Sequence, residues 1–239
     1  RVVQLSDFHI GLFFRAKAVR QAVSLANACE PDLVVLTGDF VNFRSMRFLP
    51  AGAQELPALR SRLGVFACLG NHDHWEGAEK VRAALEEVGV RVLVNESLQI
   101  TEGVCVAAVD DMMSGEPDLQ ATAHDIPEDA AVVLLSHNPT ILPQVTDRPW
   151  LVLSGHTHGG QMALPFLGPR GMTRVRGIRW IMQKYESLGL RTHGGRPEAV
   201  CGHRYPAGWF QEGEARMYVN RGIGANQAWP FRYNCTAEI

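Results

Sequence analysis

The sequence predicts an α/β fold in which two β-sheets pack together and helices cover their outer faces. Two patterns carry this prediction. In the first half of the 239-residue chain, short apolar runs alternate with segments of helical spacing, which is the order of elements in an α/β protein. Between residues 90 and 109 the apolar runs follow one another too closely for helices to separate them. This spacing favours a second, more antiparallel sheet.

The first sheet and its helices are expected within the first ninety residues. Short apolar runs indicate buried strands, and the segments between them repeat their apolar residues at helical spacing. Strands are expected over residues 2–6, 33–37 and 65–69, and helices over residues 15–29, 55–63 and 76–88.

The chain from residue 90 onwards is expected to supply the other sheet. Strands are predicted over residues 91–94, 98–101, 104–109, 132–136, 151–154 and 217–220. Residues 165–208 are rich in Gly, Pro and Arg and have weak periodicity, so we expect a long loop or insertion there. The interpretation is a single domain over residues 1–239 that carries this insertion.

The composition is that of a soluble globular protein. The net charge is −2, so no overall basic field indicates a specific nucleic-acid partner. No apolar run reaches the roughly 18 residues of a membrane span. The chain begins at Arg1 and runs directly into an expected strand, so we expect a missing N-terminal segment.

The five cysteines are widely spaced, odd in number and without a C-x-x-C pair. This argues against a zinc finger and against a dense disulfide framework. Cys29, Cys68 and Cys105 lie in apolar surroundings and are expected in the core. Whether Cys201 and Cys235 pair stays open.

Polar side chains of the metal-binding kind follow five of the expected strands. In α/β sheets, ligands gather at the carboxyl ends of the strands, so these clusters are expected to converge on one edge. Turn formation would explain Asp, Asn and Gly at these places, but it gives no reason for five histidines. The clusters are Asp7-Phe8-His9, Gly38-Asp39, Gly70-Asn71-His72-Asp73, His137 and Gly155-His156-Thr157-His158.

The spacing within two clusters is informative. Asp7 and His9 are two residues apart, and His156 and His158 repeat this spacing. In an extended chain, residues two apart project from the same face. Carboxylate and imidazole ligands without thiolate suit Mn, Fe, Co or Zn.

Taken together, the five clusters resemble the signature of the calcineurin-like metallophosphoesterases. The residues from Gly155 to Gln161 are also similar to one bacterial branch of small, often membrane-anchored phosphodiesterases, some acting on lipid-linked sugar nucleotides. Two later segments add to this likeness, 220–224 and 230–232. The resemblance covers nearly the whole chain apart from about residues 172–205. His74 departs from it, because a Tyr is expected after the G-N-H-D motif.

The resemblance implies a four-layer αββα sandwich of two mixed sheets that holds two divalent metal ions, with Mn favoured over Fe or Zn. Asp39 would bridge the two ions, His72 would reach the phosphate or leaving group, and Asp73 would orient a neighbouring ring. The first ion would be held by Asp7, His9, Asp39 and His158, and the second by Asp39, Asn71, His137 and His156.

This implied centre suits hydrolysis of a phosphodiester or pyrophosphate. Two cations roughly 3.5–4 Å apart neutralise the ester and clamp the attacking and leaving oxygens. A hydroxide that bridges the ions would be the nucleophile. Two other functions stay open: a non-catalytic metal-dependent scaffold of the same fold, and a metallohydrolase of a sulfate or carboxylic ester. His72 favours an enzyme, since a scaffold has no need of it.

The loops suggest an amphipathic phosphate ester. Residues 40–49 mix aromatic side chains with arginines, and Phe43, Arg44, Arg47 and His74 are expected to contact substrate. Residues 170–184 interleave basic and apolar side chains, which suits a membrane surface, a lipid tail or a nucleotide. A helix with one core face explains the stretch equally well.

The substrate and the location follow from the branch rather than from any one motif. UDP-2,3-diacylglucosamine is one candidate, and a cyclic nucleotide, a phospholipid or a nucleic acid stays open. A bacterial location is expected, either cytoplasmic or at the membrane through the missing N-terminal segment.

Overall fold

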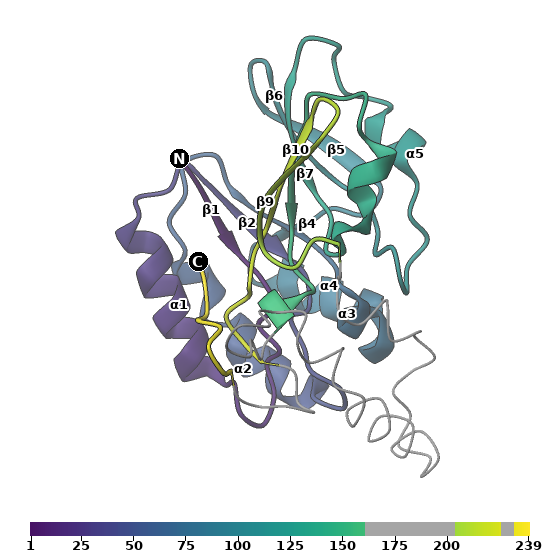
Figure 1. Cartoon of the computed structure of the whole chain (residues 1–239). Helices are drawn as coiled ribbons and strands as arrows, with labels where there is room; N and C mark the ends of the chain where they lie inside the picture. The colour runs from purple at the N-terminus through teal and green to yellow at the C-terminus, as the bar shows by residue number, and fades with distance from the viewer. Residues whose placement is uncertain (161–203, 226–231) are drawn as a thin grey trace, which may run out of the picture.

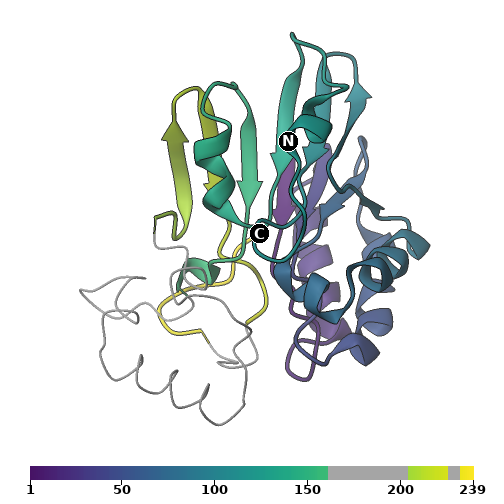
Figure 2. The same cartoon turned by 90° about the vertical axis from the view of Figure 1, so that its right-hand side faces the viewer.

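Two β-sheets pack face to face between outer layers of helices (Figures 1 and 2). The computed structural model describes residues 1–160, 204–225 and 232–239. One sheet has the strand order β1-β2-β3-β4 and the other the order β5-β6-β7-β8-β10-β9. The predicted αββα fold class is confirmed.

The four-stranded sheet is parallel throughout its described strands, and helices connect them on its outer face (Figure 2). All five residues of β2 are buried, as expected for a parallel strand covered on both faces. The strands are β1 (Val2–Leu5), β2 (Leu33–Thr37), β3 (Val65–Cys68) and β4 (Arg91–Val92), and the helices are α1 (Ala16–Ala28), α2 (Leu49–Ala53), α3 (Asn71–Glu76) and α4 (Ala78–Glu87).

The six-stranded sheet is mixed. Its inner strands β6, β7, β8 and β10 are parallel, whereas the outermost strands β5 and β9 are antiparallel to their neighbours. The strands are β5 (Glu96–Thr101), β6 (Val104–Ala108), β7 (Ala131–Leu135), β8 (Leu151–Ser154), β9 (Gly208–Glu212) and β10 (Ala215–Val219), and the covering helix is α5 (Leu119–Ala123). Short 3₁₀ turns are η1 (Met46–Phe48), η2 (Leu56–Ala58), η3 (Pro139–Gln144) and η4 (His158–Gly160).

Three apolar layers hold the four structural layers together. Along β2, Leu33 and Val35 pack with Val106 and Val133 of the other sheet, whereas the alternate residues of β2 pack towards the helices. Such alternation follows from the two-residue period of a strand. Helix α1 buries one stripe against the first sheet, formed by Val19, Ala22, Val23 and Ala26. Helix–sheet and sheet–sheet packing thus each have their own apolar layer.

Two predicted elements differ from the structure. Residues 91–94 were assigned to the second sheet, but β4 pairs in parallel with β3 of the first, because helix α4 returns the chain to that sheet. Residues 55–63 form only the turn η2 rather than a helix. The side chain of Asn27 binds Ala58 O and Arg60 N, both at 2.8 Å, and so replaces the helical hydrogen bonds.

Helices α2, α3 and α5 and strand β9 had no counterpart in the prediction. Two of the helices have only five residues and the third has six, too few to show a periodic pattern. Most of the segment 165–208 lies outside the described residues, as does the basic stretch 170–184.

Two of the three cysteines that were expected in the core are buried. Cys68 and Cys105 are buried as predicted, whereas Cys29, expected in the core, is exposed just beyond the end of α1. Cys201 lies outside the described residues, and Cys235 is buried beside the carbonyl oxygen of His158.

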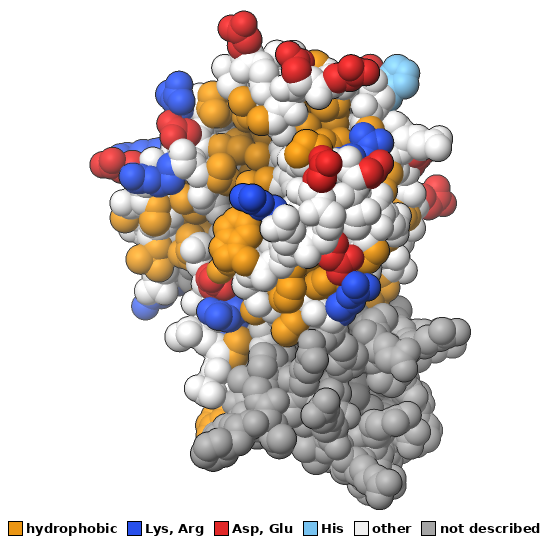
Figure 3. All heavy atoms as spheres, turned by 45° about the horizontal axis from the view of Figure 1, so that its top comes forward, with side chains coloured by type: hydrophobic (Ala, Val, Ile, Leu, Met, Phe, Trp, Pro, Cys, Tyr) orange, Lys and Arg blue, Asp and Glu red, His pale blue; other side chains and the backbone are white. Residues whose placement is uncertain are grey.

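On the face in Figure 3, acidic and basic side chains are interspersed. Within the described ranges, no helix is both long and apolar enough to cross a membrane.

Candidate metal centre

The five polar clusters meet where β1, β2, β3, β7 and β8 end. Asp7 and His9 follow β1, and Asp39 follows β2. Asn71 opens helix α3 directly after β3. The remaining histidines follow β7 and β8. All seven predicted ligands are buried: Asp7, His9, Asp39, Asn71, His137, His156 and His158.

The ligand atoms of the predicted metal ligands gather in two neighbouring groups. In the first, His9 Nε2 lies 2.9 Å from His158 Nε2, which lies 3.4 Å from Asp7 Oδ1. The ligand atoms of this first group all lie within 4.8 Å of one another. The same holds for the second group, which consists of Asp39, His137 and His156.

Asp39 stands between these two groups. Its Oδ2 lies 3.3 Å from His137 Nε2 of the second group and 3.5 Å from His9 Nε2 of the first. A carboxylate in this place has an oxygen within reach of both groups. The arrangement has the form that the resemblance implies for a bridging ligand.

Unsatisfied atoms in the centre fit a cation. Asn71 Oδ1 is buried and has no hydrogen-bond partner among the described residues, which costs about 1–3 kcal/mol unless another group binds it. His137 Nδ1 donates to Thr37 O at 2.7 Å, so its Nε2 faces the centre, as in a metal-binding histidine with a backbone acceptor. The residues present therefore fit divalent cations in both groups.

The charge states in the centre depend mainly on Asp39 and the histidines around it. Although burial alone would raise it, the neighbouring histidines, His137 first, hold the pKa of Asp39 well below its usual value. Burial acts to lower the pKa of His137, yet Asp39 holds it well above the usual value. Burial lowers the pKa values of His9 and His158, so these imidazoles are neutral and able to bind a cation.

The backbone of the ligands is strained. Nine described non-glycine residues have positive φ, and five of these are predicted ligands. Each such residue costs on the order of 1–2 kcal/mol, and such strain gathers at functional sites. The five are Asp7 (φ 53°), His9 (47°), Asp39 (56°), His156 (71°) and His158 (52°).

The backbone of Asp7 and His9 differs from the extended geometry that their spacing predicted. Asp7 and His9 do not share a face of an extended strand, because β1 ends at Leu5 and both residues are left-handed. Hydrogen bonds from Asp7 N to Gly38 O (3.0 Å) and from His9 N to Asp39 O (2.9 Å) hold the two loops together. The turns, rather than the strand pleat, aim the side chains inwards.

A family model described as calcineurin-like phosphoesterase matches residues 1–160. The chain belongs to the calcineurin-like phosphoesterases. It is 31% identical to the uncharacterized metallophosphoesterase YkuE of Bacillus subtilis and 29% identical to the phosphodiesterase YaeI of Escherichia coli. Each match spans all of this chain and 77% or 80% of the relative.

A solved structure shows the same fold at low sequence identity. A dimetal phosphatase from Danio rerio superposes with a TM-score of 0.53 and 11% identity, over 93% of this chain and 87% of that one. The family implies divalent metal ions, and the two ligand groups described above are the residues of this phosphoesterase that would hold them.

Asp73 organises the backbone of the phosphoesterase centre. Its Oδ1 accepts from Phe40 N and Val41 N, and its Oδ2 accepts from Asp39 N and Gly70 N, at 2.9–3.2 Å. Burial and the charge of Asp39 raise its pKa to about 7. Asp73 was predicted to orient a ring and to act in catalysis, but all four donors are backbone amides. It is therefore a positioning residue for the Asp39 loop.

His72 lies within the centre of the phosphoesterase without being assigned as a ligand. Its ring is 4.6 Å from that of His9, nearly perpendicular to it, and 4.6 Å from that of Trp75. Burial lowers the pKa of His72, and its Nδ1 has no partner among the described residues. One ring nitrogen of His72 lies within 4.8 Å of ligand atoms of both His9 and Asp39, so these three residues form a third group that could hold a metal ion.

The predicted substrate residues lie on the segments that follow Asp39 and Asn71. Phe43, Arg44 and Arg47 are exposed on the loop that follows Asp39. The guanidinium of Arg44 stacks on Phe43, and that of Arg47 on Phe48. His74 is different, because its Nε2 pairs with Asp110 Oδ1 at 2.7 Å.

Three polar positions near the centre had no predicted role. Asp110 and Asp111 follow β6 as the other clusters follow their strands, so the same strand-end signal was available for them. Arg232 Nη2 lies 3.3 Å from His158 Nδ1, and nothing in the local sequence shows this contact, because 74 residues separate the two.

Gly155 is packed so closely on Asp7 that we expect a side chain there to disturb the centre. A Cβ at Gly155 would overlap the side chains of Ser6 and Asp7. Gly155→Ala should cost about 1–3 kcal/mol of stability and weaken metal affinity about tenfold or more, measured by competition with a chromogenic chelator. Gly103→Ala is the control, since a Cβ there would have no atom within 4 Å. The φ of Gly103 is +69°, so this control also strains the backbone without touching the centre. Equal metal affinity in both variants would contradict the expectation.

Proposed function

We propose that the protein hydrolyses a phosphodiester or pyrophosphate bond with two divalent metal ions, Mn²⁺ favoured. The observation that carries this proposal is the position of Asp39, whose carboxylate lies between two buried ligand groups. When bound, two cations supply the positive charge that a phosphate ester requires and lower the pKa of water. The name of the relative YaeI supports a diester over a monoester.

The residues of the chain have separate tasks in this proposal. Asp7, His9 and His158 would hold one ion, and the group around His137 would hold the other. Asn71 Oδ1, which has no hydrogen-bond partner among the described residues, would complete the second set. Asp39 serves both ions. His72, neutral because burial lowers its pKa, is placed to exchange a proton or hydrogen bond with the ester.

The substrate is proposed to be amphipathic, such as a lipid-linked ester. Leu12 and Phe13 follow the His9 loop and are 46% and 63% exposed. A bridge between Ile10 and Val41 joins this loop to the one that carries Arg44 and Arg47. The apolar and basic side chains are therefore carried by two joined loops that each follow a proposed ligand, as expected for contact with an anionic lipid surface. Peripheral membrane contact is part of the proposal.

The decisive assay removes the metal and restores Mn²⁺. We expect bis-p-nitrophenyl phosphate to be hydrolysed only with metal and with a higher kcat/KM than p-nitrophenyl phosphate. His72→Ala should lower kcat on the diester about 10²-fold. His124→Ala is the matched control, because this histidine is exposed and pairs only with Asp125 among the described residues.

Other outcomes identify the rival functions. Metal binding without turnover of any ester would favour a non-catalytic binding module. Faster hydrolysis of p-nitrophenyl sulfate or p-nitrophenyl acetate would contradict the phosphoesterase chemistry.

A further inference from the structure

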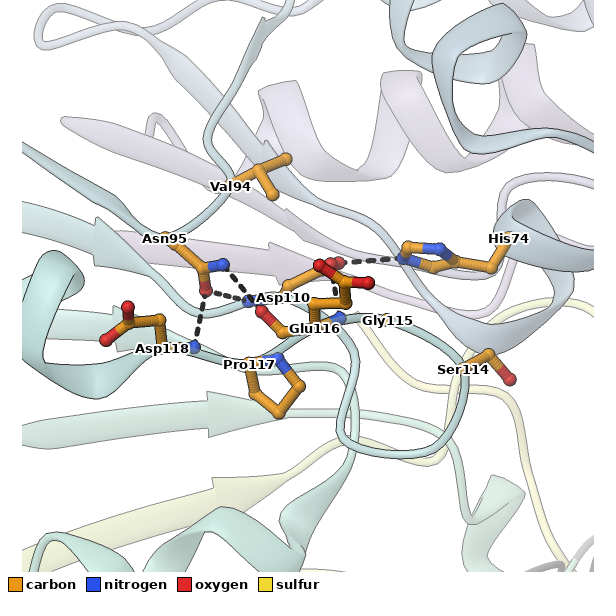
Figure 4. Close-up of a pocket in the computed structure, with 9 residues that line it drawn as sticks. All are labelled: His74, Val94, Asn95, Asp110, Ser114, Gly115, Glu116, Pro117 and Asp118. Carbon is orange, nitrogen blue, oxygen red and sulfur yellow. Dashed lines mark hydrogen bonds and ion pairs between the residues drawn. The ribbon is translucent and has the colours of Figure 1, made fainter.

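A polar groove of about 750 Å³ lies at the carboxyl ends of β4 and β6 (Figure 4). It is formed by the segments that follow β4 and β6, together with one side chain of helix α3. In Figure 4, His74 stands at one end, Asp110 and Glu116 in the middle and Asp118 at the other end. The lining residues are His74, Val94, Asn95, Asp110, Ser114, Gly115, Glu116, Pro117 and Asp118.

The sheet topology places this groove next to the second ligand group. Asn71 follows β3 and His137 follows β7, while β4 pairs with β3 and β6 pairs with β7. Neighbouring strands are about 4.8 Å apart, so the segments that line the groove follow strands one spacing away from the strands that carry these ligands. His74 is three residues after Asn71 on α3, which puts the two on the same side of the helix.

The walls of the groove are held in place by hydrogen bonds. Asn95 Oδ1 accepts from Asp110 N (2.9 Å) and Asp118 N (3.0 Å), and its Nδ2 donates to Glu116 O (2.7 Å). Asp110 Oδ2 accepts from Glu116 N at 2.9 Å. Asn95 thus ties together the ends of both sheets, and a ligand would meet a preformed surface.

The groove is negatively charged. Three carboxylates line it and His74 is its single basic side chain. His74 pairs with Asp110, but within the described chain no Lys, Arg or His pairs with Glu116. Behind the wall, Asp111 is fully buried, and its Oδ1 has no hydrogen-bond partner among the described residues. The field therefore favours a cationic group and disfavours a second phosphate.

We propose that this groove binds an amine-bearing alcohol group of the substrate diester, and that Asp110 and Glu116 determine this specificity. The inference rests on the phosphodiesterase function proposed above and narrows its substrate class. A two-carbon link from phosphorus to nitrogen spans roughly one strand spacing. A phosphate beside Asn71 and His137 would thus place its ammonium group within the groove, where Glu116 has no basic partner among the described residues. Diesters of this class suit the groove better than a nucleotide pyrophosphate does.

Two esters that differ only in charge test the proposal. p-Nitrophenyl phosphorylcholine carries a quaternary ammonium, and p-nitrophenyl 3,3-dimethylbutyl phosphate replaces its nitrogen by carbon. We expect the Mn²⁺-loaded enzyme to prefer the cationic ester about tenfold in kcat/KM. Glu116→Gln should reduce this ratio about threefold, and Asp110→Asn with Glu116→Gln should bring it to about one. Glu87→Gln, an exposed carboxylate on α4 outside the groove, should leave the ratio unchanged.

The possible results separate a failure of the proposed subsite from a failure of the proposed phosphodiesterase function. A ratio that falls both in the groove variants and at high salt, where charge attraction is screened, supports the subsite. Equal hydrolysis of the two esters by the wild type overturns the subsite and leaves the phosphodiesterase function standing. No metal-dependent hydrolysis of either ester or of bis-p-nitrophenyl phosphate overturns the function and the subsite with it.

Discussion

Asp39→Asn is expected to lower kcat/KM for a phosphodiester at least about 10³-fold and to reduce metal binding from two ions to one or none. Asp39 Oδ1 accepts from His72 N at 2.9 Å, and Oδ2 faces the nitrogens of His9 and His137. The Asn carbonyl would keep the bond to His72 N. Its amide nitrogen would then face the two histidines, where a donor cannot bind a cation. A loss of this size is about 4 kcal/mol of barrier.

The measurement combines metal content with steady-state kinetics. Metal per chain is determined by mass spectrometry after dialysis, and kcat/KM is measured with bis-p-nitrophenyl phosphate. Asp125→Asn is the control, since that carboxylate is exposed and pairs with His124. An Asp39→Asn enzyme that retained two ions and full activity would show that the carboxylate between the groups does not join them.

The positions of the ligands could be predicted because they depend on a short-range pattern. Each cluster directly follows an apolar strand, and parallel strands that lie side by side bring their carboxyl ends to one edge. Asp39, His137 and His156 are far apart in the chain, yet their ligand atoms lie within 4.8 Å. The same rule applied to β6 would also have found Asp110.

Other features could not be predicted, because long-range contacts determine them. The left-handed backbone of Asp7 and His9 depends on hydrogen bonds to the Gly38–Asp39 segment, and propensity gives no sign of it. The assignment of β4 to the first sheet depends on how helix α4 returns the chain. The bonds of Asp73 to the Asp39 loop join residues more than 30 positions apart.

Asp73→Ala is expected to lower the free energy of unfolding by about 4 kcal/mol or more. The substitution removes the acceptor of four backbone N–H groups, three of them on the loop after β2 and one at Gly70. Each buried donor left unsatisfied costs about 1–3 kcal/mol. The repulsion between Asp73 and Asp39, which contributes to the raised pKa of Asp73, is relieved at the same time and offsets part of this cost.

Asp73→Asn should fall between the wild type and the alanine variant. Its single carbonyl oxygen can serve one pair of donors, either Phe40 N and Val41 N or Asp39 N and Gly70 N. Its amide nitrogen would then face the other pair, donor against donor.

Urea unfolding of the metal-free proteins measures the stability effect without interference from metal loss. Asp118→Ala is the comparison, because it removes an exposed N-cap of α5 that accepts from two backbone amides, for about 1 kcal/mol. If Asp73→Ala were no more destabilising than this cap, the four amides would have other acceptors. The conformation of the Asp39 loop would then depend on its pairing with the loop after β1, and not on helix α3.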